Sequence, residues 1–490
     1  MSFNSIDFLL FFPIAVFVYF VVPQRVKYVW LLVCSYYFYM CWNVKYVLLL
    51  LLSTVITYAS GLLMAYRQDK AWRRLCLVSS FVINLAILIY FKYANFFITN
   101  INTVLGHAGM SANVPAVDVL LPVGISFYTF QALSYSADVY KGKTDPERNF
   151  VLYALYVSFF PQLVAGPIEK SEALISQFRE SHKWDFDRAR EGVLLMLWGY
   201  FLKMVVADRI AVYVDLCYSQ FGDFGGWYLI VATVLFAFQV YGDFAGYTTI
   251  AMGAAWIMGY KLTDNFNAPY ASKSIAEFWN RWHISLNRWF IDYVYIPLGG
   301  SRKGRLRKYI NILVVFIVSG MWHGAGWSYI IWGVLNGMYQ ITGELLRPVR
   351  DWGVKVLDLD RESIGHKIYQ VLATFVLFDF TLVFFRADST RAALIILKSM
   401  FTVHNPGILF DGRLFEAGLD ERNFVLMVLC IIVVLIADAC KYNGIQIRGI
   451  IAKQAMWLRV LVIACSIVFI LLFGMWGSGY NAANFIYFQF

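Results

Sequence analysis

Apolar segments recur along almost the whole chain, and they limit the fold more than any other feature. A transmembrane helix needs about 20 mainly apolar residues. Candidate segments cover approximately residues 6–22, 28–42, 45–66, 75–98, 118–137, 150–166, 190–207, 227–258, 309–322, 327–346, 368–385, 423–440 and 456–476. The sequence therefore predicts an all-α polytopic integral membrane protein, built as a single membrane-embedded domain over residues 1–490.

Composition supports this class and excludes others. Of the 490 residues, 60% are hydrophobic and 15% charged, whereas a soluble domain is about half apolar and about a quarter charged. The seven cysteines form no CxxC pair, so neither a disulfide framework nor a zinc site is indicated. A cytosolic enzyme, a disulfide-built secreted domain and a disordered chain are thereby excluded.

Two of the apolar segments contain helix breakers. Pro122 lies in segment 118–137, and Pro161, Gly166 and Pro167 lie in or beside segment 150–166. Backbone without helical hydrogen bonds is tolerated at membrane depth only where protein or water satisfies it. We therefore expect broken or re-entrant helices in these two segments.

The basic residues predict the orientation in the membrane. The net charge of +10 is explained by short cytoplasmic loops, which collect Lys and Arg, and it does not indicate nucleic-acid binding. If the basic clusters lie on the cytoplasmic side, both termini are predicted to lie on the outer side of the cell membrane. The clusters are Arg25 and Lys27; Arg67, Lys70, Arg73 and Arg74; Arg302, Lys303, Arg305, Arg307 and Lys308; Arg347, Arg350, Lys355 and Arg361; and Lys441, Arg448 and Lys453.

The cluster that ends at Lys308 and the cluster that begins at Arg347 predict a hairpin between them that enters and leaves the membrane from the same side. Its ascending part, 309–322, has about 14 residues and would span roughly 21 Å, less than the 30 Å of a hydrocarbon core. The apex, His323 to Gly326, is then expected within the bilayer. An ionisable group at that depth indicates function by default.

Two of the six histidines lie outside polar loops. His323 lies in the stretch SGMWHGAGW, where glycines permit close approach and tryptophans form an apolar wall. A neutral imidazole in such a site can take a proton from an incoming hydroxyl. The alternative is a histidine that hydrogen-bonds to a neighbouring helix.

His283 lies in the stretch EFWNRWHISLNRW, between residues 277 and 289. On one continuous helix, Trp279, Trp282, His283 and Trp289 would share a face. This stretch, including Asn280, is either the polar lining of a channel that reaches His323 or an interfacial amphipathic helix. The pattern alone does not separate the two.

Three further features have a functional and a structural interpretation. Asp243, in an apolar run, either supports the polar lining or, as the favoured alternative, pairs with Arg281 or orients a helix. The loop 299–304 resembles a phosphate-binding loop only loosely. Its Arg302 and Lys303, with Arg305, either hold donor phosphates or only set the topology. The C-terminal tail, 477–490, either anchors at the interface or folds back so that Tyr487 accepts an acyl group.

These stretches together resemble the membrane-bound O-acyltransferase family, in particular its bacterial alginate O-acetyltransferase-like branch. The most specific match is the pair WNRWH and MWHG; FNSIDF, PQLVAGPI, YGDFAGY, YIPLGGS and FFRA fit the same branch. The resemblance implies about 11–13 membrane helices, with re-entrant or short helices, around a central tunnel. We place the catalytic core at about 118–346.

The resemblance also implies the reaction. An acyl group, by default acetyl from acetyl-CoA, would pass from the cytoplasmic side past the catalytic His323 and the second family histidine, His283. A separate extracytoplasmic protein of the SGNH type would complete O-acetylation of a cell-envelope polysaccharide outside a bacterial cell membrane. Tyr487 would carry the acyl group. A thioester is already activated, so no metal is expected.

Other functions remain open at this point. The nearest alternative is a D-alanyl or lipid O-acyltransferase of the same family. A transporter would also explain buried polar groups in broken helices, although the sequence has no inverted pseudo-repeat. A non-catalytic scaffold that recruits the external enzyme is the third.

Overall fold

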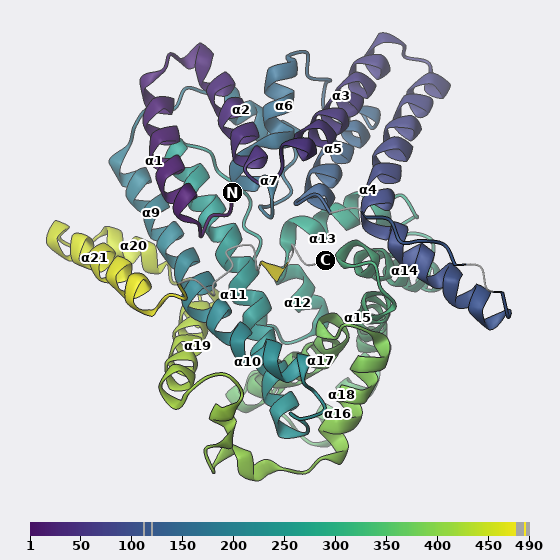
Figure 1. The fold of residues 1–490 in the computed structure, drawn as a ribbon, viewed down its shortest axis with the longest axis vertical. Helices are drawn as coiled ribbons and strands as arrows, with labels where there is room; N and C mark the ends of the chain where they lie inside the picture. Colours follow the sequence, from purple (N-terminus) through teal and green to yellow (C-terminus); the bar gives the residue numbers. More distant parts are fainter. Residues whose placement is uncertain (111–112, 119–120, 477–484, 487–490) are drawn as a thin grey trace. The chain divides into compact units, whose positions relative to one another are not determined.

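The computed structural model describes residues 1–110, 113–118, 121–476 and 485–486. Within these ranges the chain forms helices joined by turns and loops, and it contains no β-strand (Figure 1). The predicted all-α membrane class is therefore confirmed. The predicted segments also coincide with observed helices, most within a few residues at each end.

Six helices in the described part of the chain are both long enough and apolar enough to cross a membrane. The remaining predicted segments form helices that are shorter or more polar, so the number of 11–13 membrane helices stays a prediction. The six are α3 (Val44–Tyr66), α4 (Lys70–His107), α11 (Trp227–Met258), α17 (Ile364–Arg386), α19 (Glu421–Tyr442) and α21 (Met456–Phe473).

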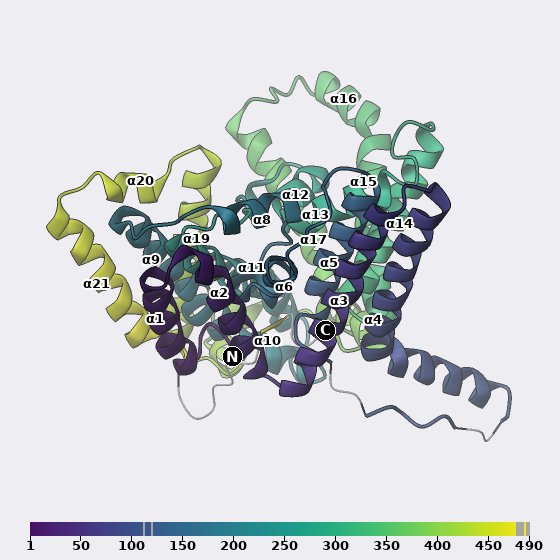
Figure 2. The ribbon, with the colours of Figure 1, turned by 90° about the horizontal axis from the view of Figure 1, so that it is seen from above.

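The chain divides into two compact units. The first contains Met1–Met196, Ile250–Thr263 and residues 485–486 of the C-terminal end. Figure 2 shows the end of α4 projecting beyond its neighbours α3 and α5. Besides α3, α4 and most of α9 (Phe186–Tyr200), this unit holds α1 (Ile6–Val21), α2 (Gln24–Met40), α5 (Ile125–Tyr140), α6 (Phe150–Ser158), α7 (Phe160–Leu163) and α8 (Ser171–Arg179).

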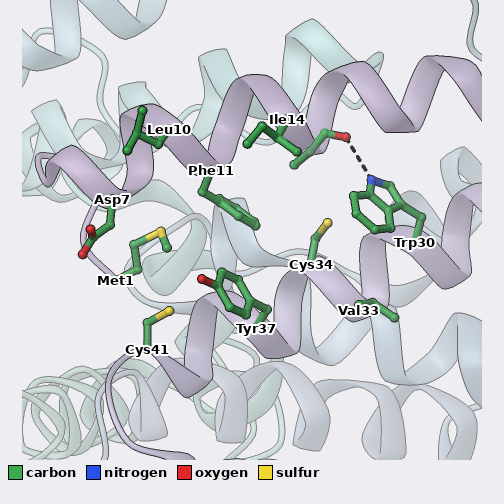
Figure 3. A pocket seen from close by; sticks show the side chains of 11 residues that line it. Met1, Asp7, Leu10, Phe11, Ile14, Trp30, Val33, Cys34, Tyr37 and Cys41 are labelled. Atoms are coloured by element: carbon green, nitrogen blue, oxygen red, sulfur yellow. Dashed lines mark hydrogen bonds between the residues drawn. The ribbon is translucent and has the colours of Figure 1, made fainter.

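Helices α1 and α2 pack side by side around a groove. The Ser5 hydroxyl caps α1 by accepting a hydrogen bond from the Phe8 N–H at 3.2 Å, as an N-cap serine does. The Trp30 indole donates to the Ala15 carbonyl at 2.9 Å. The groove has a volume of about 620 Å³ and is mainly apolar, with Asp7 and Cys41 near one end (Figure 3).

The expected breaks are present. Helix α5 begins only after Gly124, whose φ of +74° is left-handed. A Cβ atom there would lie 2.8 Å from the Leu163 carbonyl oxygen, so glycine is required at this close approach. Helix α6 ends at Ser158, and Pro161 is the second residue of the short helix α7. The two helix interruptions predicted from Pro and Gly are thus confirmed.

The second unit contains Leu197–Thr249 and the described part of Asp264–Asn481. It includes two π-helical segments, η1 (Phe201–Ala207) and η3 (Ile291–Tyr295), and most of α11. Its other elements are α10 (Asp208–Ser219), η2 (Pro269–Ala271), α12 (Ile275–Arg281), α13 (Ile284–Phe290), α14 (Arg305–His323), α15 (Trp327–Leu345), α16 (Arg347–Val356), α17, α18 (Thr390–Thr402), η4 (Pro406–Leu409), η5 (Arg413–Glu416), α19, α20 (Ile447–Ala452) and α21.

Helices α14 and α15 form the expected hairpin. Their backbones touch at two glycines, since a Cβ on Gly333 would lie 2.2 Å from the Phe316 carbonyl oxygen and one on Gly320 would lie 2.3 Å from that of Tyr329. The two helices are adjacent in both ribbon views (Figures 1 and 2).

The hairpin differs from the prediction in one respect. Helix α14 has 19 residues, so it is about 28 Å long, and the expected ascending part of 14 residues was too short. The reason is that the basic residues from Arg305 to Lys308 form its first turn instead of a loop. From Lys308 to His323 the helix still rises about 22 Å.

Candidate functional site

His323 is the last residue of α14, and its side chain is buried at 4% exposure. The helix stops there because Gly324 continues in an extended conformation. A Cβ on Gly324 would lie 2.1 Å from the Tyr329 ring, so no larger residue fits beside the imidazole. Sequence position and packing together hold His323 at the tip of the hairpin.

Aromatic rings from three helices surround this imidazole. Trp322 of α14, Trp332 of α15 and Phe385 of α17 lie with ring centroids 4.9, 5.1 and 5.4 Å from that of His323. All three rings are themselves buried. Such walls exclude water, and a dry site protects an activated acyl group from hydrolysis.

His283 lies between α12 and α13 in a left-handed conformation, with φ of +46°. Non-glycine residues adopt this region uncommonly, and strained backbone of this kind clusters at functional sites. Asn265 holds the turn, because its carbonyl and side-chain oxygens accept from the N–H groups of Ile284 at 3.0 Å and Ser285 at 3.1 Å. The buried imidazole ring lies 4.6 Å from Phe244 and 6.0 Å from Trp322.

Trp322 therefore contacts both histidines that the sequence singled out. His283 and His323, which lie on either side of the loop that precedes α14 in the sequence, thus both pack against the same indole. The expected single helix through His283 is wrong, because α12 ends at Arg281 and α13 begins at Ile284. The left-handed turn ends the helical periodicity, so the four aromatic and imidazole residues share no helical face.

Asp243 is buried in α11 and pairs with a lysine that the sequence analysis overlooked. Its carboxylate lies 2.5 Å from Lys203 Nζ, which also lies 2.8 Å from Asp208. The expected partner, Arg281, instead binds Glu277 one helical turn away at 2.9 Å. Lys203 could have been found by the rule applied to Asp243, since it stands in the apolar segment 190–207.

The other predicted site residues in the described ranges are exposed. Asn280 lies on the exposed side of α12, whereas Phe278 and Trp279 of that helix are buried, so its lining role stays a prediction. Arg302, Lys303 and Arg305 are exposed and make no ion pair with any residue in the described ranges.

Arg302 and Lys303 lie in the glycine-containing loop before α14, whose first residue is Arg305. Gly299, Gly300 and Gly304 all have positive φ, and the Asn311 side chain donates to the Gly300 carbonyl at 2.9 Å. The contact of the three basic residues with a donor stays a prediction.

Tyr487 lies outside the residues that the structure describes. The two preceding residues are described, and both are buried, with Phe485 at 1% and Ile486 at 5% exposure. In the described ranges no group of three or more His, Cys, Asp and Glu side chains has an arrangement that could hold a metal ion.

This arrangement suits proton transfer at an activated ester. A buried imidazole beside glycines can accept a proton from a hydroxyl that approaches it. Residues 37–352, which include both histidines, match the model of the membrane-bound O-acyltransferase family. The chain belongs to the membrane-bound O-acyltransferase family. It is accordingly an acyltransferase, as the sequence predicted, and not the transporter or scaffold that the sequence left open.

Two of the relatives match nearly the whole chain, and a third matches about half of it. A probable alginate O-acetylase AlgI from Pseudomonas putida is 34% identical over 503 residues, which cover 100% of both chains. A peptidoglycan O-acetyltransferase from Helicobacter pylori is 30% identical over 98% of this chain and 95% of its own. A teichoic acid D-alanyltransferase from Bacillus subtilis is 28% identical over 46% of this chain and 59% of its own.

Proposed function

We propose that this acyltransferase takes an acetyl group from a cytoplasmic thioester, acetyl-CoA by default, and passes it across the cell membrane for O-acetylation of an extracytoplasmic cell-envelope polysaccharide. The observation that carries this proposal is the placement of two buried histidines against one tryptophan, His323 and His283 against Trp322. This pair supplies a proton acceptor inside a water-excluding aromatic site.

The acetyl group and the polysaccharide are supported by the relatives. Those that match nearly the whole chain are called alginate O-acetylase and peptidoglycan O-acetyltransferase. The D-alanyltransferase relative matches only about half of it. A D-alanyl transfer is therefore the second candidate.

The reaction at His323 follows from ordinary thioester chemistry. The imidazole takes the proton of the acceptor hydroxyl, whose oxygen bonds to the thioester carbonyl carbon. The carbon–sulfur bond then breaks, and the imidazolium returns the proton to the leaving thiolate. General base catalysis of this kind contributes about 10²–10⁴ in rate. His283, whose ring also packs against Trp322, is proposed to stabilise the site.

The two sides of the membrane are assigned from the charges. The tendency of short cytoplasmic loops to collect Lys and Arg supports a cytoplasmic position for Arg302, Lys303 and Arg305. Their guanidinium and ammonium groups would suit the phosphates of coenzyme A there. Both termini are then outside. Asp243 and Asn280 are proposed to contribute to the polar surroundings of the path between the two sides.

The final transfer is proposed to use the C-terminal tail and a partner. Tyr487 would accept the acetyl group and carry it as a tyrosine ester. The two residues that precede it, Phe485 and Ile486, are buried. An extracytoplasmic SGNH-type protein would then take the group from the tyrosine ester and transfer it to the sugar hydroxyl.

A deletion strain complemented with His323→Ala tests the proposal. We expect alkali-released acetate from the envelope polysaccharide to fall to the level of the deletion strain, while the protein accumulates normally in membranes. His404→Ala is the matched control, since His404 is exposed, and it should restore acetate fully. Full acetylation by the His323→Ala protein would contradict the proposal, and released D-alanine in place of acetate would favour the second candidate.

A further inference from the structure

Lys203 is an almost fully buried cation in the middle of an apolar segment. Its side chain is 3% exposed, and its Nζ atom lies 2.8 Å from Asp208 and 2.5 Å from Asp243. Removing an ammonium group and carboxylates from water is costly, and such a cluster persists only when its geometry is good. Ionisable groups placed so deep in a membrane protein are rare and indicate function.

The ion pair joins two helices that already touch through glycine. A Cβ on Gly242 of α11 would lie 2.9 Å from the Leu202 carbonyl oxygen. A Cβ on Gly246 would lie 2.9 Å from the backbone nitrogen of Lys203. Both contacts are with η1, and Asp243 lies between these two glycines in the sequence. Close approach and ion pair together fix the rotation and the height of α11 against η1.

The residue after Asp243 contacts the site. Phe244 lies edge-on to His283, with ring centroids 4.6 Å apart and planes at 73°. His283 stands in a turn between two seven-residue helices, so its ring orientation depends on the rings that pack against it. Phe244 is one of these, and its own position is set by α11.

We propose that Lys203 is a positioning residue for acyl transfer: by holding Asp243 it fixes α11, and through Phe244 it sets the orientation of His283. This inference rests on the proposed function, in which the transfer needs the histidine pair. Lys203 itself takes no proton and contacts no substrate in this mechanism. Its charge matters because only a cation holds the carboxylate of α11 at this depth.

A double-mutant cycle tests the inference with membranes that contain the full chain. The probe is radiolabelled acetyl-CoA, and the readout is acetate incorporated into the envelope polysaccharide. Lys203→Met and Phe244→Leu should each lower turnover about tenfold or more, because small misplacements of reacting groups are costly in rate. If Lys203 acts through Phe244, the double variant should be no slower than the slower single variant.

Phe238→Leu is the matched control on the same helix. Phe238 contacts Tyr270 and Phe375, and within the described part of the chain its ring packs against neither histidine. The fold-loss of turnover in the Phe238→Leu, Lys203→Met double variant should therefore equal the product of the two single-variant losses. Lys203→Arg, which keeps the charge, should recover most of the turnover, and the apparent KM for acetyl-CoA should change less than twofold in every variant.

Asp243→Asn gives a second route if Lys203→Met does not accumulate in membranes. It breaks the pair on α11 while Lys203 keeps Asp208, and it should show the same non-additivity with Phe244→Leu. The inference would be overturned if the turnover losses of Phe244→Leu and of either Lys203→Met or Asp243→Asn multiplied in the double variant. If the unmodified protein transfers no acetate from acetyl-CoA, the proposed function fails, which is a different result.

Discussion

The imidazole of His323 stands edge-on to the indole of Trp332, with ring centroids 5.1 Å apart and planes at 84°. Trp332 is 3% exposed and also packs against Trp279 and Phe385, at 5.6 and 5.2 Å. The indole therefore connects the His323 site to the buried side of α12 and to α17. Its large ring fills the space beside the imidazole.

Trp332→Leu should lower acyl transfer by about tenfold to a hundredfold, because the imidazole loses a wall and shifts from its position. The measurement is the rate of acetate incorporation at equal protein level. Trp327→Leu is the control, since Trp327 is 58% exposed. Equal activity of the two variants would show that the enclosure of His323 is unimportant.

Substitutions of His283 should separate the backbone from the imidazole. His283→Ala should lower the free energy of unfolding by about 2–5 kcal/mol, because it leaves a cavity beside Phe244 and Trp322 and places alanine in the left-handed region. His283→Asn should lower it less, since asparagine fills more of the space and tolerates this region, and His283→Gly should lose the ring packing but not the backbone tolerance. All three should lose most acyl transfer. Normal turnover by the asparagine variant would mean that the ring itself has no role.

Gly333→Ala should destabilise the hairpin. The added methyl group would lie 2.2 Å from the Phe316 carbonyl oxygen, so α14 and α15 must separate at a cost of about 1–3 kcal/mol. Gly343→Ala, on the same helix, places its methyl group in open space and should be neutral or stabilising by up to about 1 kcal/mol. Thermal unfolding in detergent compares the two, and similar melting temperatures would contradict the close packing.

Tyr487→Phe should abolish acetate delivery to the polysaccharide while leaving the melting temperature unchanged, because it removes only the hydroxyl that is proposed to carry the acetyl group. Mass spectrometry of the unmodified protein, trapped without its acceptor, should show one acetyl group on Tyr487. Retained delivery by the phenylalanine variant would favour the interface anchor.

Much of the site could be read from the sequence. Apolar length predicted the helices, and helix breakers predicted the interruptions at Gly124 and before Pro161, because both signals are local. The rarity of ionisable groups in apolar stretches directed attention to His323, His283 and Asp243. The WNRWH and MWHG motifs then indicated the family that residues 37–352 match.

Only the tertiary structure decided which of these residues meet. Lys203 and Asp243 are far apart in the chain, and the sequence favoured Arg281 as the partner, although Arg281 is satisfied by Glu277 one turn away. The left-handed turn at His283 depends on Asn265, which precedes it by 18 positions. Periodicity and hydropathy describe one segment at a time, whereas ion pairs and ring contacts between segments are fixed by how the helices pack.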